Sequence, residues 1–246
     1  MDNSTYVSVS LARALQRELD VTANNVANAS TAGFKGERVA FDSFVVRGEA
    51  RQAPVSYVID RGSYIDARPG SLSQTGNPLD LAVQGSGWLA YRTPDGQTAY
   101  GRNGQLTLDA QGGLVTAAGA PVLDRGGAPI AIPPDAAGSV SIAADGTISA
   151  QGFGPIAQIG LFDLPDLQSY SRIGGGLLLP PEDAQAPLPD MQSSIVQGAI
   201  ETSNVEPVLE MTRMLAIQKA YDRATTLIQA EDDRQRSMLQ RLGDTA

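Results

Sequence analysis

Apolar residues near the start of the chain recur at the spacing of one helical face. Between residues 4 and 28 they are separated by four or seven positions, and Thr22 lies on the same stripe. The stripe consists of Leu11, Leu15, Leu19 and Val26. Asn and Thr residues then lower the helix propensity, and Gly33 can end a helix in the left-handed conformation. The pattern predicts an amphipathic helix that stops near Asn28.

From Pro54 to about Phe162 the pattern changes to short β-rich runs separated by glycine-centred turns. The runs span residues 79–83, 88–91, 105–108, 114–116, 140–142 and 156–161. Asp95-Gly96, Asn103-Gly104 and Asp145-Gly146 lie between runs, and we expect hairpin turns there because both residues of such dipeptides can adopt positive φ. No segment between the runs fits the crossover helix that parallel strands need. The middle of the chain is therefore predicted to be an antiparallel β domain.

The end of the chain has the apolar spacing of a coiled-coil helix. Ser203-Asn204 precedes Glu206-Pro207, a combination that caps and opens a helix. Apolar residues then follow alternating steps of three and four, with Glu231 and Gln235 in the two remaining seam positions. The seam consists of Met214, Ile217, Tyr221, Ala224, Ile228, Met238 and Leu242. The pattern predicts a long helix, which packs either on the first helix of the same chain or also on helices of other subunits.

These changes of pattern divide the chain into five segments. Residues 174–190 contain three consecutive glycines and four prolines, too many breakers for regular structure. The expected segments are 1–35, an N-terminal helix with an Asn-rich exit; 36–75, a connecting β and loop segment; 76–173, the central antiparallel β domain; 174–202, a Gly/Pro-rich connector; and 203–246, a C-terminal helix. The expected fold class is mainly β with α, in which helices of coiled-coil type flank the β domain.

Composition excludes several classes of function. The net charge of −9 and pI of about 4.5 disfavour binding to nucleic acid or to an anionic membrane surface. The chain has neither Cys nor His, so it lacks thiol nucleophiles, Ser-His-Asp triads and most zinc ligand sets. No apolar run approaches the roughly 20 residues that cross a bilayer. Its start lacks a basic region of the secretory type, so we expect no cleaved signal peptide and no membrane insertion.

Two patterns resemble catalytic or cofactor sites but have structural explanations. Residues 84–90 contain GxGxxA after a predicted strand, yet a β-rich run follows where a dinucleotide site needs a helix, so a turn between strands is expected. Carboxylates in the β region could be paired for glycoside hydrolysis, but most lie beside Gly or Pro, where Asp serves turn geometry. They are Asp80, Asp109, Asp124, Asp145, Asp163 and Asp166. Trp88, the single Trp, is expected in the core, and we expect no catalytic, cofactor or metal site.

Three segments resemble the signatures of flagellar rod and hook axial proteins. The N-terminal signature is carried by Asn24, Asn25, Asn28, Gly33, Phe34 and Lys35; the β-domain signature by Gly76, Asn77, Pro78, Leu79, Asp80, Arg102, Asn103 and Gly104. The third runs from Ser203-Asn204-Val205 to Gln218-Lys219-Ala220-Tyr221, so the resemblance spans nearly the whole chain. Gly101 and Trp88-Leu89 depart from residues usual in the family, which affects local packing only.

The resemblance implies a structural subunit without catalysis. It implies export through the flagellar type III apparatus without signal cleavage, and assembly with itself and other rod proteins into a periplasmic rod that transmits torque from motor to hook. The end helices would pack with those of neighbouring subunits near the rod axis, and the β domain would project outward. The Asn24, Asn25 and Asn28 group would shape the exit from the first helix through side-chain to backbone hydrogen bonds.

Two other classes of function stay open from the sequence. A secreted β-domain enzyme or adhesin would need a carboxylate pair or a ligand cleft. A chaperone-like or capping scaffold would associate with a rod only transiently.

Overall fold

The computed structural model describes residues 3–46 and 55–243, and it divides into two compact units. The helical unit contains Met1–Ala27, Glu37–Asp66 and Glu206–Ala246, and the β unit contains Asn28–Gly36 and Ala67–Val205. The chain therefore passes from one unit to the other at four places along its length. The helices at the two ends and the antiparallel strands between them confirm the expected fold class.

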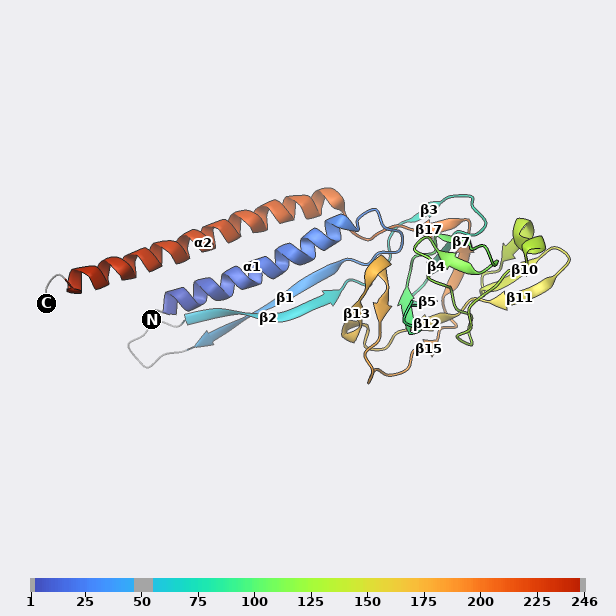
Figure 1. Cartoon of the computed structure of the whole chain (residues 1–246), viewed down its shortest axis with the longest axis horizontal. Coiled ribbons are helices and arrows are strands. Elements are labelled where there is room, and N and C mark those ends of the chain that lie inside the picture. Colours follow the sequence, from blue (N-terminus) through green and yellow to red (C-terminus); the bar gives the residue numbers. More distant parts are fainter. Residues whose placement is uncertain (1–2, 47–54, 244–246) are drawn as a thin grey trace. The chain divides into compact units, whose positions relative to one another are not determined.

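The helical unit consists of two helices and one long hairpin. Helix α1 spans Asn3–Ala27 and α2 spans Pro207–Gly243, and they run in opposite directions (Figure 1). Strands β1, Glu37–Val46, and β2, Val55–Ile65, pair antiparallel with an irregular register between Val39 and Phe41. Helix α1 lies between α2 and the hairpin and contacts both. Its end at Ala27 is one residue from the predicted stop.

The β unit is built from short antiparallel strands and three 3-10 turns. Its six-stranded sheet has the order β13-β14-β6-β5-β12-β15, its three-stranded sheet the order β11-β10-β9, and its two-stranded pairs are β16-β4, β17-β3 and β7-β8. The strands are β3 Leu72–Gln74, β4 Leu81–Gln84, β5 Trp88–Arg92, β6 Thr98–Gly101, β7 Leu106–Leu108, β8 Leu114–Thr116, β9 Val140–Ile142, β10 Thr147–Ala150, β11 Gly154–Gln158, β12 Leu161–Asp163, β13 Ser171–Arg172, β14 Leu178–Leu179, β15 Leu188–Pro189, β16 Ser194–Gln197 and β17 Ala199–Glu201. The 3-10 turns are η1 Pro134–Ser139, η2 Leu167–Ser169 and η3 Gly174–Gly176.

One apolar core fills the β unit. Its members come from the inward faces of most strands and include Leu81, Leu89, Leu114, Val122 and Ile148. Trp88 is also buried, as expected. Gly85 and Gly87 of the GxGxxA pattern lie between β4 and β5, and the segment that follows is a strand, so the helix that a dinucleotide site needs is not there.

The turns differ in part from the expected hairpin geometry. Asp95-Gly96 and Asp145-Gly146 do connect paired strands, but among their central residues only the glycines have positive φ. In each turn two backbone bonds, such as Gly146 N to Ala143 O and Ala143 N to Thr147 O, give a type I turn with a glycine bulge. Asn103-Gly104 was wrongly predicted as a hairpin turn, because β6 and β7 on either side of it do not pair with each other.

The proline-rich stretch also contains more regular structure than predicted. Residues 174–190 include β14 and β15, two strands of two residues each. Leu178 is buried and pairs with Tyr100 of β6. Breakers keep these strands short, but an apolar residue between them still reaches the core, so the expectation of no regular structure was wrong here.

Candidate functional site

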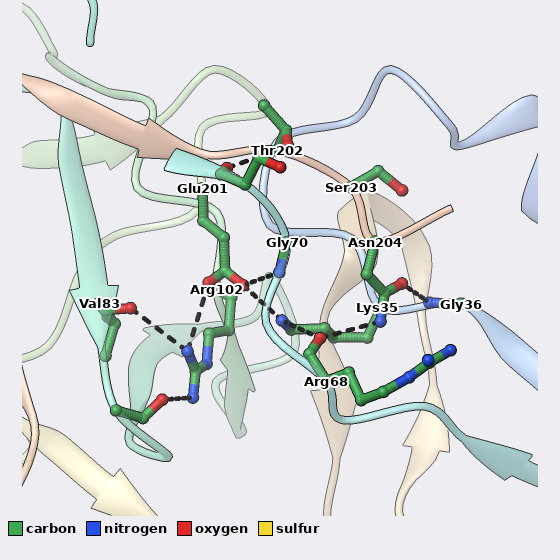
Figure 2. Close-up of polar contacts among 12 residues, drawn as sticks. Lys35, Gly36, Arg68, Gly70, Val83, Arg102, Glu201, Thr202, Ser203 and Asn204 are labelled. Atoms are coloured by element: carbon green, nitrogen blue, oxygen red, sulfur yellow. Dashed lines mark hydrogen bonds and ion pairs between the residues drawn. The ribbon is translucent and has the colours of Figure 1, made fainter. Parts of the chain in front are cut away.

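A buried cluster of opposite charges lies in the β unit and joins residues from two of the three family signatures. Glu201 Oε1 lies 2.5 Å from Lys35 Nζ, and Glu201 Oε2 lies 3.3 Å from Arg102 Nη1 (Figure 2). Their side chains are 2%, 3% and 0% exposed for Lys35, Arg102 and Glu201. Buried charges of this kind are tolerated only when paired and hydrogen-bonded. We call these three residues the Glu201 cluster.

Backbone groups complete the shell around the cluster. Gly70 N donates to Glu201 Oε1 over 2.8 Å, and Lys35 Nζ donates to Arg68 O over 2.9 Å. Arg102 Nη2 donates to Gly85 O over 2.7 Å. The Glu201 carboxylate is therefore bonded to two cations and one backbone amide, and both cations also donate hydrogen bonds to backbone carbonyl oxygens.

Asn204 belongs to the same polar assembly. Its Oδ1 accepts a hydrogen bond from Gly36 N over 2.7 Å, and its Nδ2 donates to Arg68 O over 3.0 Å. The Asn204 side chain thus does not cap α2, which corrects the sequence interpretation. The helix nevertheless opens with Pro207 in its first turn as predicted, and Glu210 N donates to Glu206 O over 3.0 Å.

Gly33 allows the N-terminal signature to approach this cluster closely. Its φ is +66°, and a Cβ at this position would lie 2.1 Å from the carbonyl carbon of Arg102. Gly33 N also donates to Glu201 O over 2.7 Å. Next to it, Phe34 is buried under the Arg172 guanidinium, whose carbon is 4.5 Å from the ring centroid. Only glycine fits both the conformation and the space.

The Asn-rich exit from α1 is held by the second Asn of the signature. Asn25 is buried, donates from Nδ2 to Glu37 O over 2.8 Å and accepts at Oδ1 from Glu37 N over 2.9 Å. Asn28 Oδ1 accepts a hydrogen bond from Thr31 Oγ1 over 3.2 Å. Asn24 is exposed. The amide of Asn25 pairs with a strand backbone, which ties the end of α1 to the start of β1.

The β-domain signature forms a turn that leads into β4. Asn77 Nδ2 donates to Asp80 Oδ1 over 3.0 Å, and Leu79 N donates to Asn77 Oδ1 over 3.2 Å. Pro78 is exposed in this turn, and Gly76 has φ +75°. A Cβ on Gly104 would lie 1.7 Å from Leu81 O, so this glycine permits two backbone segments to touch. Asn103 O accepts from the Tyr91 hydroxyl over 2.7 Å.

The predicted packing residues of α2 divide into buried and exposed positions. Ile217 and Ala224, one heptad apart, are buried within the helical unit. Met214, Tyr221 and Ile228 are half-buried, and Met238 is 53% exposed. Leu242 lies outside the residues whose side chains the structure describes.

On α1 the buried positions are mostly small or polar: Ser8, Ala14, Thr22 and Asn25. Of the predicted stripe, Leu15, Leu19 and Val26 are half-buried and Leu11 is exposed. Helix α1 is joined to α2 by an ion pair, Glu18 Oε1 to Arg213 Nη2 at 2.7 Å. At the start of α2, the buried Glu210 pairs with Arg38 of β1 at 2.9 Å.

Large apolar side chains on the first turns of α2 are exposed: Val208 is 79% exposed, Leu209 55%, Met211 48% and Leu215 57%. Val208, Met211 and Leu215 follow steps of three and four, so they share one face of the helix, whereas Leu209 lies about 100° around the helix from Val208. Large apolar side chains that gather on a surface mark an interaction site. We call Val208, Met211 and Leu215 the α2 apolar patch, which the sequence seam did not include.

Three of the six carboxylates considered for catalysis accept hydrogen bonds from backbone amides within their own turns. Asp109 Oδ1 accepts from Gln111 N and Gly113 N, and Asp124 Oδ1 accepts from Gly126 N and Ala128 N. Hydrogen bonds from the Thr147 backbone and hydroxyl lower the pKa of Asp145 below its usual value. Among the described residues, acids are not gathered into a metal-binding group, and no helix is long and apolar enough to cross a membrane.

Three family models match the chain at the segments described above. The flagella basal body rod protein family matches residues 6–35, the flagellar hook protein FlgE/F/G D1 domain matches residues 82–150, and the flagellar basal body rod FlgEFG protein C-terminal family matches residues 196–241. The matches therefore include α1, the centre of the β unit, and β17 with most of α2.

Whole-chain relatives agree with these matches. The chain is 39% identical to the flagellar basal-body rod protein FlgF of Caulobacter vibrioides, over 99% of both chains. It is 34% identical to FlgF of Salmonella typhimurium, over 95% of both, and 30% identical to the rod protein FlgG of Agrobacterium fabrum, over 89% of this chain and 92% of that one. The chain belongs to the flagellar rod and hook protein family. Within that family it is a structural subunit of the basal-body rod, of the FlgF type.

Proposed function

We propose that the subunit enters the rod by burying the exposed faces of its end helices against neighbouring rod proteins. The α2 apolar patch is the observation that carries this proposal, because it exposes three large apolar side chains on one helix face within eight positions. Removing apolar surface from water contributes about 25 cal/mol per Å² to association, before the entropic costs of binding are subtracted. The predicted packing residues Leu11, Leu15, Leu19, Val26 and Met238 would extend the contact along both helices.

The length difference between the helices supports the same proposal. Helix α2 has 37 residues and α1 has 25. At about 1.5 Å per residue, α2 is roughly 18 Å longer than its partner. Figure 1 shows that the C-terminal part of α2 continues past the start of α1. This part leaves seam positions such as Met238 open to helices of other subunits.

The finer features of the function follow from family membership and remain part of the proposal. The subunit would be exported by the flagellar type III apparatus without signal cleavage, would lie in the periplasmic section of the rod, and would transmit torque to the hook. Its role would be mechanical and not catalytic, since the candidate acids Asp109, Asp124 and Asp145 are engaged by turn amides.

The test separates assembly from folding by choosing an exposed apolar residue. Leu215→Asp places a charge on the α2 apolar patch but not in the interior of the chain. Gln218→Asp, at an exposed polar position on the same helix, is the matched control. We expect both purified proteins to keep wild-type circular dichroism and thermal unfolding. Basal bodies isolated from complemented cells should contain the Gln218→Asp protein and lack the Leu215→Asp protein.

Replacement of Ile217 or Ile228 by Asp is also expected to weaken rod incorporation. Ile217 is buried, so its Asp variant should in addition unfold at lower temperature. Normal rods and motility with a folded Leu215→Asp protein would contradict the proposed surface.

A further inference from the structure

Three of the segments that link the β unit to the helical unit are bonded to the same small region of the β unit. Residues 33–36 precede β1, residues 68–70 follow β2, and residues 201–204 precede α2. Lys35, Gly70 and Glu201 meet through the Glu201 carboxylate, and Asn204 bonds to Gly36 N and Arg68 O. Figure 2 shows these three segments side by side around the Glu201 and Asn204 side chains.

Arg102 connects this meeting point to the central sheet of the β unit. It directly follows β6, which lies between β14 and β5 in the six-stranded sheet. Its guanidinium bonds to Glu201 Oε2, Gly85 O and Val83 O, and lies 5.2 Å from the Trp88 ring of β5. A force on any of the three linking segments therefore acts on side chains fixed to the six-stranded sheet of the unit.

From this convergence we propose that the Glu201 cluster is a mechanical anchor, through which load on the linking segments enters the β unit. The inference rests on the proposed function, in which the subunit carries torque. A charge cluster is suited to this role because separating buried ions requires bringing them through a medium of low dielectric constant.

A merely stabilising cluster is the competing explanation, and the direction of pulling distinguishes the two. The chain has no Cys, so introduced cysteines give unique attachment points. Handles at Glu206→Cys and Gln151→Cys, both exposed positions, would load the segment 201–205. Handles at Asp95→Cys and Gln151→Cys, both in exposed turns of the β unit, would not load the linking segments.

The experiment uses the full chain at constant force in an optical trap. It measures the rate at which the structure between the two handles comes apart, which we call the detachment rate. Glu201→Gln leaves Lys35 and Arg102 buried without their counter-charge, so it should detach at least about ten times faster when pulled from residue 206. Lys35→Met keeps the Arg102–Glu201 pair and should show the same direction of change if Glu201→Gln does not fold. Arg92→Met is the matched control, because Arg92 also bonds to backbone carbonyls, at Gly96 and Gly127, away from the linking segments.

The proposal is supported if the cluster variants accelerate detachment across the linking segments more than within the β unit, while Arg92→Met does not. The proposal is overturned if the cluster variants accelerate detachment equally with both pairs of handles, or do not accelerate it when the chain is pulled from residue 206. The measurement uses purified single chains, so it is independent of rod incorporation. A failure of the α2 apolar patch proposal would leave these detachment rates unchanged, and the two failures are distinguishable.

Discussion

Replacing Gly33 by Ala tests whether the close approach of the N-terminal signature to Arg102 stabilises the β unit. The alanine must adopt φ +66°, which costs an L-residue about 1–2 kcal/mol. Its Cβ would also overlap the Arg102 carbonyl at 2.1–2.2 Å and Asn103 N at 2.4 Å. Both are backbone atoms, which cannot rotate away as a flexible side chain would.

The expected magnitude combines these two costs. Overpacking by a single carbon typically costs about 1–3 kcal/mol, and the loss of glycine entropy in the unfolded chain returns about 0.4–1 kcal/mol. The net loss of unfolding free energy is therefore about 1–5 kcal/mol. For a unit of about 150 residues, this corresponds to a Tm lower by about 2–18 °C.

Trp88 gives an assay specific to the β unit. It is the single Trp of the chain, it is buried, and it lies beside Arg102. Thermal unfolding followed by Trp fluorescence should show the decrease for Gly33→Ala. Gly138→Ala is the control, because a Cβ there meets no atom within 4 Å and the backbone does not have positive φ. A Gly33→Ala protein that unfolds within 1 °C of the control would refute the steric argument.

Two further predictions concern one buried hydroxyl and one ion pair. Burial raises the pKa of the Tyr91 phenol above its ordinary value of 10.0. Above pH 10 the unfolded chain therefore releases a proton that the folded chain retains, so stability falls as the pH rises. At pH 8 the free energy of unfolding of Tyr91→Phe should be lower by about 1 kcal/mol, because the hydrogen bond to Asn103 O is lost. Above pH 10 its free energy of unfolding, measured by urea titration, should fall less steeply with pH than that of the wild type. Equal slopes for both proteins would contradict this. A double-mutant cycle of Glu18→Ala and Arg213→Ala should give a coupling of about 0.2–1 kcal/mol that shrinks in 1 M salt, and no coupling at low salt would show that the α1–α2 ion pair does not contribute.

Local spacing predicted the end of the first helix, the start of the second, and six of the strands of the β unit, namely β4, β5, β7, β8, β9 and β11. The stop near Asn28 and the start at Pro207 depend on residues within one turn of the boundary, so they were readable from the sequence. The Glu201 cluster could not be predicted from the sequence in this way. Its ion pairs join residues 166 and 99 positions apart, beyond the range of any spacing rule. The available signal was an acid at an inward position of β17, two residues after the buried Ala199.

The type of turn also could not be predicted from the sequence. Asp-Gly and Asn-Gly dipeptides occur both in hairpins and in segments such as Asn103-Gly104, where the glycine is required by contact with Leu81 O. The dipeptide alone cannot separate these cases, because the contacting residue comes from a strand elsewhere in the chain. Asn103 and Gly104 belong to a family signature, but a signature does not indicate which atoms its residues contact.

The order of segments in the chain has a consequence for how the protein folds when it emerges N-terminus first. Helix α1 is the first element, but its partner α2 begins at residue 207, after the whole β unit. The contact order of the helical unit is therefore very high, whereas the β unit is complete by residue 205. During emergence the β unit can close while α1 is partnered by the β1–β2 hairpin and its α2 side stays uncovered. The docking of α1 on α2 is therefore among the last contacts of the helical unit to form.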